Sequence, residues 1–270
     1  MRRRPVYDLV KIARSKRANA WLGRLHGNLL IGLGYGWWIT KHNRHHAHPN
    51  QLGRDPDIAD GAITFTRADA RRHGAVRRFV TGRQAWFFFP ILLLEALNLH
   101  AASTRTFLDP GTGSRWTKAV EGGLLLIHFA GYLAAVFWVL SPIQAVCFIA
   151  IQQGLFGVYM GCSFAPNHKG MTVFGPGEKV DFLRRQVLTS RNIRGGHVTA
   201  WVLGGLNYQI EHHLFPSMPR PNIRRAQSRV RAFCTRHGVA YHDTGLWHSY
   251  AQVLHHLNTV GGPLRPELEY

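Results

Sequence analysis

Acidic residues and cysteines are scarce in this sequence of 270 residues. Asp and Glu together number 14 against 33 Lys and Arg, which gives a formal net charge of +19 when His is neutral. Three cysteines are too few for a disulfide scaffold or a four-cysteine zinc module. Hydrophobic residues make up 46% of the chain, which excludes a disordered polybasic tail. The positive charge is compatible with nucleic acid or with an anionic membrane as partner.

Charged residues are missing altogether from residues 122–166. A helix that spans a bilayer needs about 20 apolar residues, and this run divides at Ser141-Pro142 into two segments of that length. We predict a transmembrane hairpin at about 122–140 and 143–165, because soluble hairpins rarely lack a charged face. Nucleic-acid binding would require basic and aromatic residues interleaved on a soluble face, so we expect no nucleic-acid partner.

The position of the basic residues predicts how the hairpin is oriented. Arg115 and Lys118 precede it and several basic residues between 169 and 194 follow it, whereas its closed end has none. This is the positive-inside pattern, so both open ends are expected on the cytoplasmic side. The basic stretch 219–237 is expected to form an amphipathic cytoplasmic helix whose arginines meet anionic membrane lipids.

A third apolar stretch, residues 86–102, contains Pro90 and Glu95 and follows a strongly basic segment, residues 67–83. A crossing here would place that segment opposite the other basic residues. We therefore predict an interfacial or re-entrant helix over 86–102. The fold class expected is an all-α integral membrane domain.

Histidines form two arrays with the spacing of metal ligands. Residues 42–46 read H-N-R-H-H and residues 209–213 read Q-I-E-H-H, and positions i, i+3 and i+4 of a helix share one face. Two spans separate the arrays, so both emerge on one side of the membrane, where His168 ends the second span. Imidazole-rich ligation suits iron, copper, nickel or zinc, and more than four His favours two metals. The predicted ligands are His42, His45, His46, His168, His212 and His213.

Other polar residues near the arrays are weaker candidates. Those that could orient ligands or serve as secondary ligands are Gln209, Asn207, Glu211 and His197. Residues 55–57, Asp-Pro-Asp, form either a turn or a support for a metal ligand, and the turn is favoured. His128, inside the first span, is interpreted as a packing or hydrogen-bonding residue.

Several motifs stand along the chain from about Arg14 to about His237. They are G-N-L-L at 27–30, W-W at 37–38, K-H-N-R-H-H at 41–46, D-P-D-I at 55–58, F-A-P-N-H-K-G at 164–170 and N-Y-Q-I-E-H-H-L-F-P at 207–216. Together they resemble the membrane fatty acid desaturase family. The resemblance is closest to the bacterial acyl-lipid or acyl-CoA branch, which is similar to linoleoyl-CoA desaturases. Gln in the first place of the last array is similar to the front-end desaturases.

The resemblance implies an oxidoreductase of lipid metabolism. Its members hold a non-haem diiron centre in histidine boxes and use O2 to introduce a C=C bond into an acyl lipid or acyl-CoA. Because no cytochrome b5 domain is recognisable here, a separate ferredoxin or cytochrome with its reductase is expected to supply electrons. Other classes remain open: a non-catalytic membrane remnant, or a related histidine-box lipid hydroxylase or ketolase.

One part of the family pattern is missing from the sequence. The family has a first box of the form H-D-x-G-H, whose histidines are expected near Pro5 and Leu9, and an apolar hairpin before it. We therefore interpret residues 1–270 as one desaturase-type membrane domain that lacks this hairpin and the first box. We therefore expect either an N-terminally truncated enzyme or a decayed one, with only part of the ligand set.

Overall fold

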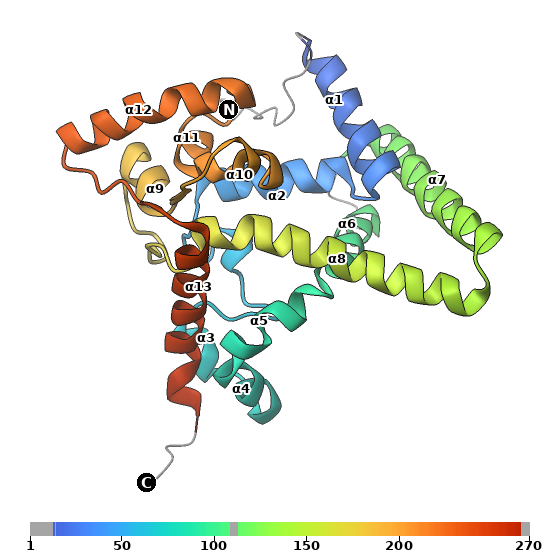
Figure 1. Cartoon of the computed structure of the whole chain (residues 1–270), viewed down its shortest axis with the longest axis horizontal. Coiled ribbons are helices and arrows are strands. Elements are labelled where there is room, and N and C mark those ends of the chain that lie inside the picture. Colours follow the sequence, from blue (N-terminus) through green and yellow to red (C-terminus); the bar gives the residue numbers. More distant parts are fainter. Residues whose placement is uncertain (1–12, 14, 109–112, 266–270) are drawn as a thin grey trace. The chain divides into compact units, whose positions relative to one another are not determined.

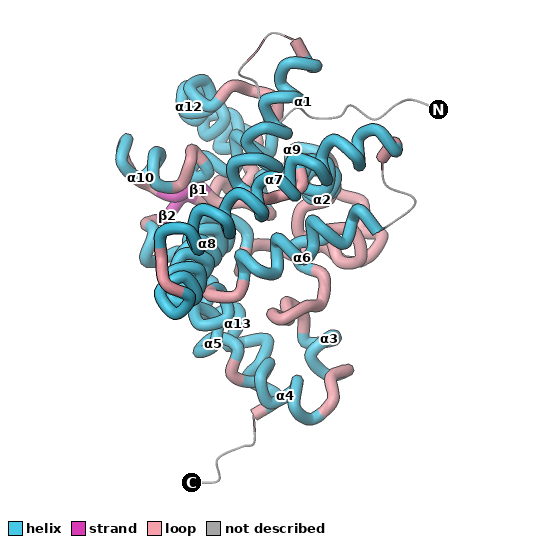
Figure 2. Tube along the Cα trace, turned by 90° about the vertical axis from the view of Figure 1, so that its right-hand side faces the viewer, coloured by secondary structure: helices cyan, strands magenta, loops and turns pink. Residues whose placement is uncertain are grey.

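The computed structural model describes residues 13, 15–108 and 113–265. These residues are mostly helical, with very little strand (Figures 1 and 2), so the predicted all-α class is confirmed. The strands among them are β1 (Asn192–Ile193) and β2 (Asp243–Thr244), which pair in parallel with Asn192 opposite Asp243. The positions expected for the first histidine box, Pro5 and Leu9, lie outside the described residues.

The chain divides into two compact units. The first contains residues 1–43 and 92–160, and the second contains residues 44–91 and 161–270. Three helices contribute residues to both: α2 (Tyr35–Ala47), α5 (Gln84–Leu92) and α8 (Pro142–His168). Each unit is described by itself below.

The predicted hairpin is confirmed in the first unit. Helix α7 (Arg115–Val139, 25 residues) and α8 (27 residues) are both long and apolar enough to cross a membrane. In their most apolar stretches only 11% and 17% of the residues are buried inside the protein, as expected for helices that face lipid. Both helices exceed the predicted spans, because α7 starts at Arg115 after the cap Ser114 and α8 continues to His168.

The third apolar stretch forms two helices rather than one. Helix α5 (Gln84–Leu92) and α6 (Glu95–Leu108) are separated by a sharply bent break, as in a broken span or a re-entrant loop. The single helix expected over 86–102 is therefore interrupted at residues 93–94. In the first unit Gly157 packs against this break: a Cβ there would lie 2.9 Å from the backbone nitrogen of Ala96. The missing side chain lets α8 approach the interrupted backbone closely.

A buried carboxylate anchors the start of α7 within the first unit. Glu121 accepts hydrogen bonds from Arg24 Nε at 3.2 Å and from the Gly36 N–H at 2.9 Å. These partners lie on α1 (Lys16–Arg24) and α2, while Asn28 Nδ2 donates to the Glu121 carbonyl at 3.2 Å. Because a buried charge must be paired, this cluster determines how these helices meet.

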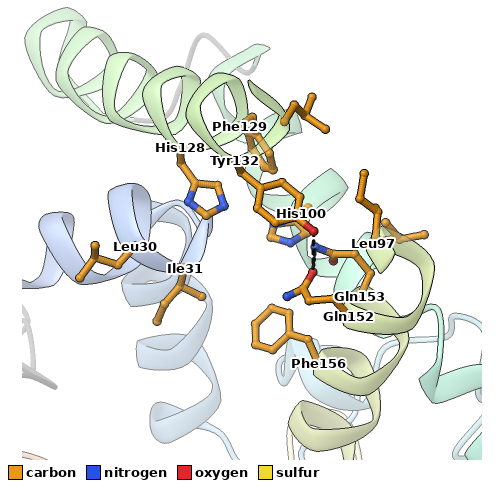
Figure 3. A pocket seen from close by; sticks show the side chains of 12 residues that line it. Leu30, Ile31, Leu97, His100, His128, Phe129, Tyr132, Gln152, Gln153 and Phe156 are labelled. Carbon is orange, nitrogen blue, oxygen red and sulfur yellow. Dashed lines mark hydrogen bonds between the residues drawn. The ribbon is translucent and has the colours of Figure 1, made fainter. Parts of the chain in front are cut away.

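Two histidines, His128 on α7 and His100 on α6, bond the end of the π-helical turn η1 (Leu25–Ile31) and its cap Gly32. His128 Nδ1 donates to the Leu29 carbonyl and His100 Nδ1 to the Gly32 carbonyl, each at 2.8 Å. His128 is thus a hydrogen-bonding residue, as its sequence context indicates. Both rings line a largely apolar cavity of about 460 Å³ within the first unit (Figure 3).

The second unit surrounds a small apolar core. Helices α9 (Phe182–Leu188), α11 (Gln209–Leu214) and α12 (Arg220–Arg236) pack through buried side chains that include Val187, Ile210 and Val230. Helix α12 is the predicted basic amphipathic helix, with a buried face and six arginines. The remaining elements of this unit are η2 (Pro56–Ile58), α3 (Arg67–Arg71), α4 (Ala75–Gly82), α10 (His197–Val202), η3 (Leu206–Tyr208), α13 (Leu246–Gly261) and η4 (Gly262–Leu264).

Candidate metal centre

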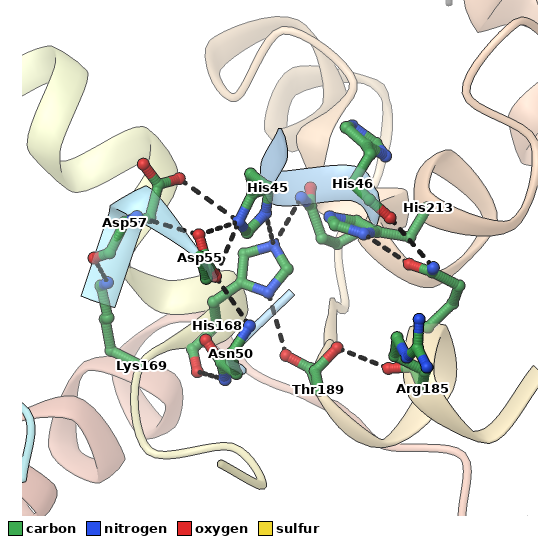
Figure 4. Close-up of polar contacts among 12 residues, drawn as sticks. His45, His46, Asn50, Asp55, Asp57, His168, Lys169, Arg185, Thr189 and His213 are labelled. Carbon is green, nitrogen blue, oxygen red and sulfur yellow. Dashed lines mark hydrogen bonds and ion pairs between the residues drawn. The ribbon is translucent and has the colours of Figure 1, made fainter. Parts of the chain in front are cut away.

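Five of the six predicted ligands lie together in the second unit. His45 and His46 are in the last turn of α2, His168 is the last residue of α8, and α11 carries the remaining two histidines near its end. Figure 4 shows the rings of His45, His46, His168 and His213 turned toward a common region. Three helix ends, far apart in the sequence, therefore bring their imidazoles to one place.

One group, called the tight group below, consists of His45, His168 and His213. One ring nitrogen of each lies within 4.8 Å of the other two, and all three side chains are buried. The Nε2 atoms of His45 and His168 are 3.4 Å apart. The Nε2 atom of His213 is buried and has no hydrogen-bond partner among the described residues. A buried ring nitrogen without a partner is costly unless something else satisfies it, and a metal ion would do so.

His46 and His212 form a second pair beside this group. Their Nε2 atoms are 3.2 Å apart and their rings meet edge to face, with centroids 4.7 Å apart. The ring of His46 also stacks on that of His213 at a centroid distance of 4.2 Å. His42 belongs to the first unit. It lies one turn before His46 on α2, so the helix directs both side chains to the same face.

Each imidazole of the tight group is held at its outer nitrogen. The Nδ1 atom of His45 lies 3.0 Å from the carboxylate of Asp55. His168 Nδ1 donates to the Thr189 carbonyl at 2.9 Å, and His213 Nδ1 donates to Gln186 Oε1 at 3.0 Å. Because Nδ1 carries the proton in these bonds, the lone pair of each Nε2 points into the cluster.

The electrostatics differ among the histidines, and those of His212 and His213 suit ligation. Burial lowers the pKa of His213 well below its usual value, and burial aided by the charge of Arg220 lowers the pKa of His212 to about 4. These rings are neutral at pH 7 and available as ligands. At His45 burial also acts to lower the pKa, but Asp55 and Asp57 outweigh it and the pKa is raised.

Asp55 connects the turn at residues 55–57 to the cluster. Its buried carboxylate accepts the backbone N–H of Asn50 at 2.7 Å and that of Asp57 at 2.9 Å, besides the ring of His45. It also caps η2. The Asp-Pro-Asp sequence is thus a turn, as favoured above, whose first carboxylate also supports a predicted ligand.

The secondary candidates lie in different surroundings. Gln209 Nε2 is 2.9 Å from His168 Nε2, so its amide borders the tight group. Asn207 is fully buried, and in the part of the chain that the structure describes neither polar atom of its side chain has a hydrogen-bond partner. Glu211 instead accepts hydrogen bonds from Asn192 and Tyr241, at 2.7 and 2.8 Å. His197 is exposed and lies against Arg224.

Three residues that support the cluster carry no recognisable pattern in the sequence. Gln186 bonds His213 and also donates to the His46 carbonyl at 3.1 Å. Thr189 contributes a backbone carbonyl, which no side-chain motif reveals. Asn50 Nδ2 donates to the His168 carbonyl at 3.0 Å across 118 residues of sequence. Only the folded chain brings these partners together.

The donor set fits a transition metal. Several neutral imidazoles, buried together and held at their outer nitrogens, are the ligands that iron, zinc, copper and nickel prefer. Among the described residues, the carboxylates near the group are those of Asp55 and Asp57, which lie at its edge beside His45. Calcium and magnesium prefer oxygen ligands, so this arrangement disfavours them.

Comparisons with known proteins agree with this donor set. The sequence model of the fatty acid desaturase family matches residues 11–245. An acyl-lipid (9-3)-desaturase of Physcomitrium patens is 30% identical over 248 residues, which are 90% of this chain and 47% of the relative. A Δ8 fatty acid desaturase of Arabidopsis thaliana is 29% identical, covering 87% of this chain and 55% of the relative. A Δ5 fatty acid desaturase of Caenorhabditis elegans is 29% identical, covering 82% and 52%.

The chain spans about half the length of these curated relatives. The family match covers most of the chain and includes both histidine arrays and His168. With two helices able to cross a membrane and five histidines, four of them buried, gathered at three helix ends, the chain belongs to the fatty acid desaturase family.

Proposed function

We propose that this chain supplies a non-haem diiron centre for O2-dependent desaturation of an acyl chain. The observation that carries the proposal is the buried group of His45, His168 and His213, whose ring nitrogens lie within 4.8 Å of one another. His46 and His212 are proposed as ligands of the second iron, and His42 remains a predicted ligand on the same face of α2 as His46.

Iron, when bound, would supply the activation of O2 that removal of two hydrogens from an unactivated acyl chain requires. The residues of the chain perform the other tasks. Asp55, Thr189 and Gln186 hold the three imidazoles by their Nδ1 atoms, so that the ligand geometry exists before metal arrives. Burial of the rings excludes water from their inner nitrogens.

One proton has a defined place in the cluster. It lies on Nδ1 of His45, facing the carboxylate of Asp55 at 3.0 Å. The negative charge of Asp55 makes this imidazole a stronger electron donor through Nε2. Asp55 therefore acts on the metal through His45, as a positioning residue.

The substrate and partners follow from the membrane setting and from the family. We propose a fatty acyl lipid or acyl-CoA as substrate, a separate ferredoxin or cytochrome with its reductase as electron donor, and anionic membrane lipids around α12. The basic residues on the open side of the hairpin favour a cytoplasmic location for the histidines. The printed names of the relatives, acyl-lipid and fatty-acid desaturases, support the acyl substrate.

The proposal is tested by metal content and by lipid composition in the same preparation. The chain is expressed in a bacterial membrane, purified in detergent and analysed for iron, and the fatty acids of the host are analysed by gas chromatography. We expect bound iron and new unsaturated acyl chains, both lost in His213→Ala and both retained in His197→Ala. Iron-free protein together with unchanged acyl chains would refute the proposal and favour a non-catalytic membrane protein.

A further inference from the structure

The second unit has a basic recess that the proposed metal centre does not use. Its cavity measures about 860 Å³ and lies between α10, the following Gly204–Tyr208 segment and the first turns of α12. None of the residues that line it is acidic. The residues that line it include Arg220, Arg224, Arg225, His197 and Trp201.

Three guanidinium groups meet at this recess without carboxylate partners. Among the described residues, Arg220, Arg224 and Arg225 form no ion pair, and all three are exposed. The Nη1 atom of Arg224 lies 2.9 Å from Nε2 of His197, which joins the two walls. So many unpaired donors around one concavity favour an anion with several oxygens, and the planar fork of Arg matches phosphate best.

The floor of the recess is built for a long basic side chain. Gly204 and Gly205 have φ values of +57° and +82°, a conformation that favours glycine. A Cβ at Gly204 would lie 3.4 Å from Nη1 of Arg220, and one at Gly205 would lie 3.5 Å from its Cδ. The positive φ values therefore account for the paired glycines, and Arg220 lies across their loop within van der Waals distance, with its guanidinium at the recess.

The rim is apolar, which distinguishes a lipid from a soluble phosphate. Trp201 is 82% exposed and Val198, one turn earlier on α10, is 75% exposed. Exposed Trp beside basic residues is typical of protein surfaces at the membrane interface, where the ring lies at headgroup level. A free phosphate ion would gain nothing from these two side chains.

We propose that this recess binds the phosphate of a membrane phospholipid headgroup, with Arg220, Arg224 and Arg225 on the phosphate and Trp201 beside the glycerol and upper acyl region. The inference deepens the proposed role of anionic lipids as partners by assigning them a site, and it needs neither iron nor catalysis. Arg229 and Arg236 lie on the same helix but do not line the recess, so they provide a matched control.

The test is native mass spectrometry of the full chain in detergent, with three probes: phosphatidylglycerol, diacylglycerol with the same acyl chains, and inorganic phosphate. We expect phosphatidylglycerol adducts on the wild-type chain and few diacylglycerol adducts. Arg220→Gln/Arg224→Gln should weaken phosphatidylglycerol binding about tenfold or more, since charge-assisted hydrogen bonds are lost. Arg229→Gln/Arg236→Gln, which removes the same charge, should leave it within about twofold.

The apolar rim is tested separately. Trp201→Ser should reduce retention of phosphatidylglycerol without changing any binding of inorganic phosphate. Equal losses of phosphatidylglycerol binding in the two double-arginine variants would show a general charge effect and overturn the proposed site. Unchanged binding in Arg220→Gln/Arg224→Gln would also overturn it. Binding of inorganic phosphate alone, with no lipid adduct, would overturn the assignment to a phospholipid. The iron content of the wild-type chain and of Trp201→Ser reports on the proposed function independently, whereas Arg220 also acts on His212 through its charge.

Discussion

The carboxylate of Asp55 offers the sharpest test of the metal centre. Its side chain is fully buried, and its two oxygens accept the backbone N–H groups of Asn50 and Asp57 as well as the ring of His45. In Asp55→Asn one carboxylate oxygen is replaced by an NH2 group. Because each oxygen accepts a backbone N–H, the NH2 group faces a donor whichever oxygen it replaces. We therefore expect two defects in one variant, one in the stability of the unit and one in the affinity for metal.

The size of each defect follows from the contacts that are lost. The variant loses the charge that strengthens these hydrogen bonds, and one backbone N–H is left against another donor. At about 1.5–3 kcal/mol for a hydrogen bond to a charged group, we expect the free energy of unfolding to fall by about 2–4 kcal/mol. Loss of the partner that orients a ligand typically weakens metal binding by about 10- to 100-fold.

The assay measures iron retained by the purified chain during titration with a chelator, with thermal unfolding of the same samples in detergent. A matched control exists in Asp60→Asn, because Asp60 lies 3.1 Å from Nε2 of His73 in an Asp–His pair outside the cluster. We expect the control to retain iron like the wild-type chain. If Asp55→Asn keeps wild-type iron affinity, Asp55 does not orient a metal ligand and the reasoning is refuted.

Three further predictions concern stability, pH and metal affinity. Although burial opposes it, the hydrogen bond from His73 and the charge of Arg77 lower the pKa of Asp60, so its ionised form stabilises the fold. The difference in free energy of unfolding between the wild-type chain and Asp60→Asn should be constant above about pH 5. It should disappear as the pH falls through and below about 4. A difference that grows on acidification would contradict this prediction. Gly157→Ala should lower the melting temperature because of the close approach of Leu92, whereas Gly131→Ala, which has open space, should leave it unchanged or raise it. Gln186→Leu should weaken iron binding about 10- to 100-fold without loss of the helical circular dichroism signal, and unchanged affinity would show that its bond to the cluster is dispensable.

Much of the architecture could be predicted from local patterns. The uncharged run of residues 122–166 indicated two spanning helices, since the bilayer excludes charge from any such segment. The break between the two helices at Ser141-Pro142 could also be predicted from the sequence, because Pro is tolerated at the first turn of a helix. The interruption of the third apolar stretch at residues 93–94 was not, because it depends on close packing against Gly157, which is distant in sequence.

The candidate metal centre, too, could be predicted from the sequence only in part. Helical spacing alone predicted that His42, His45 and His46 share one helix face, and it singled out the Q-x-x-H-H array at residues 209–213. The partners of the outer nitrogens, Gln186 and the Thr189 carbonyl, came only from the fold, because hydrogen bonds between distant segments leave no periodic trace in the sequence.

The amino-acid sequence by itself determined the class of the protein: its all-helical membrane character and the chemistry of its ligands. These are properties of runs and spacings, which the chain has before it folds. The tertiary structure decided which nitrogen of each imidazole faces the cluster, and it made Asp55 a partner of His45 as well as a turn residue. It also gathered three arginines around the recess beside α10. Burial and long-range packing set these features, because a side chain's partner and its access to water exist only once distant segments meet.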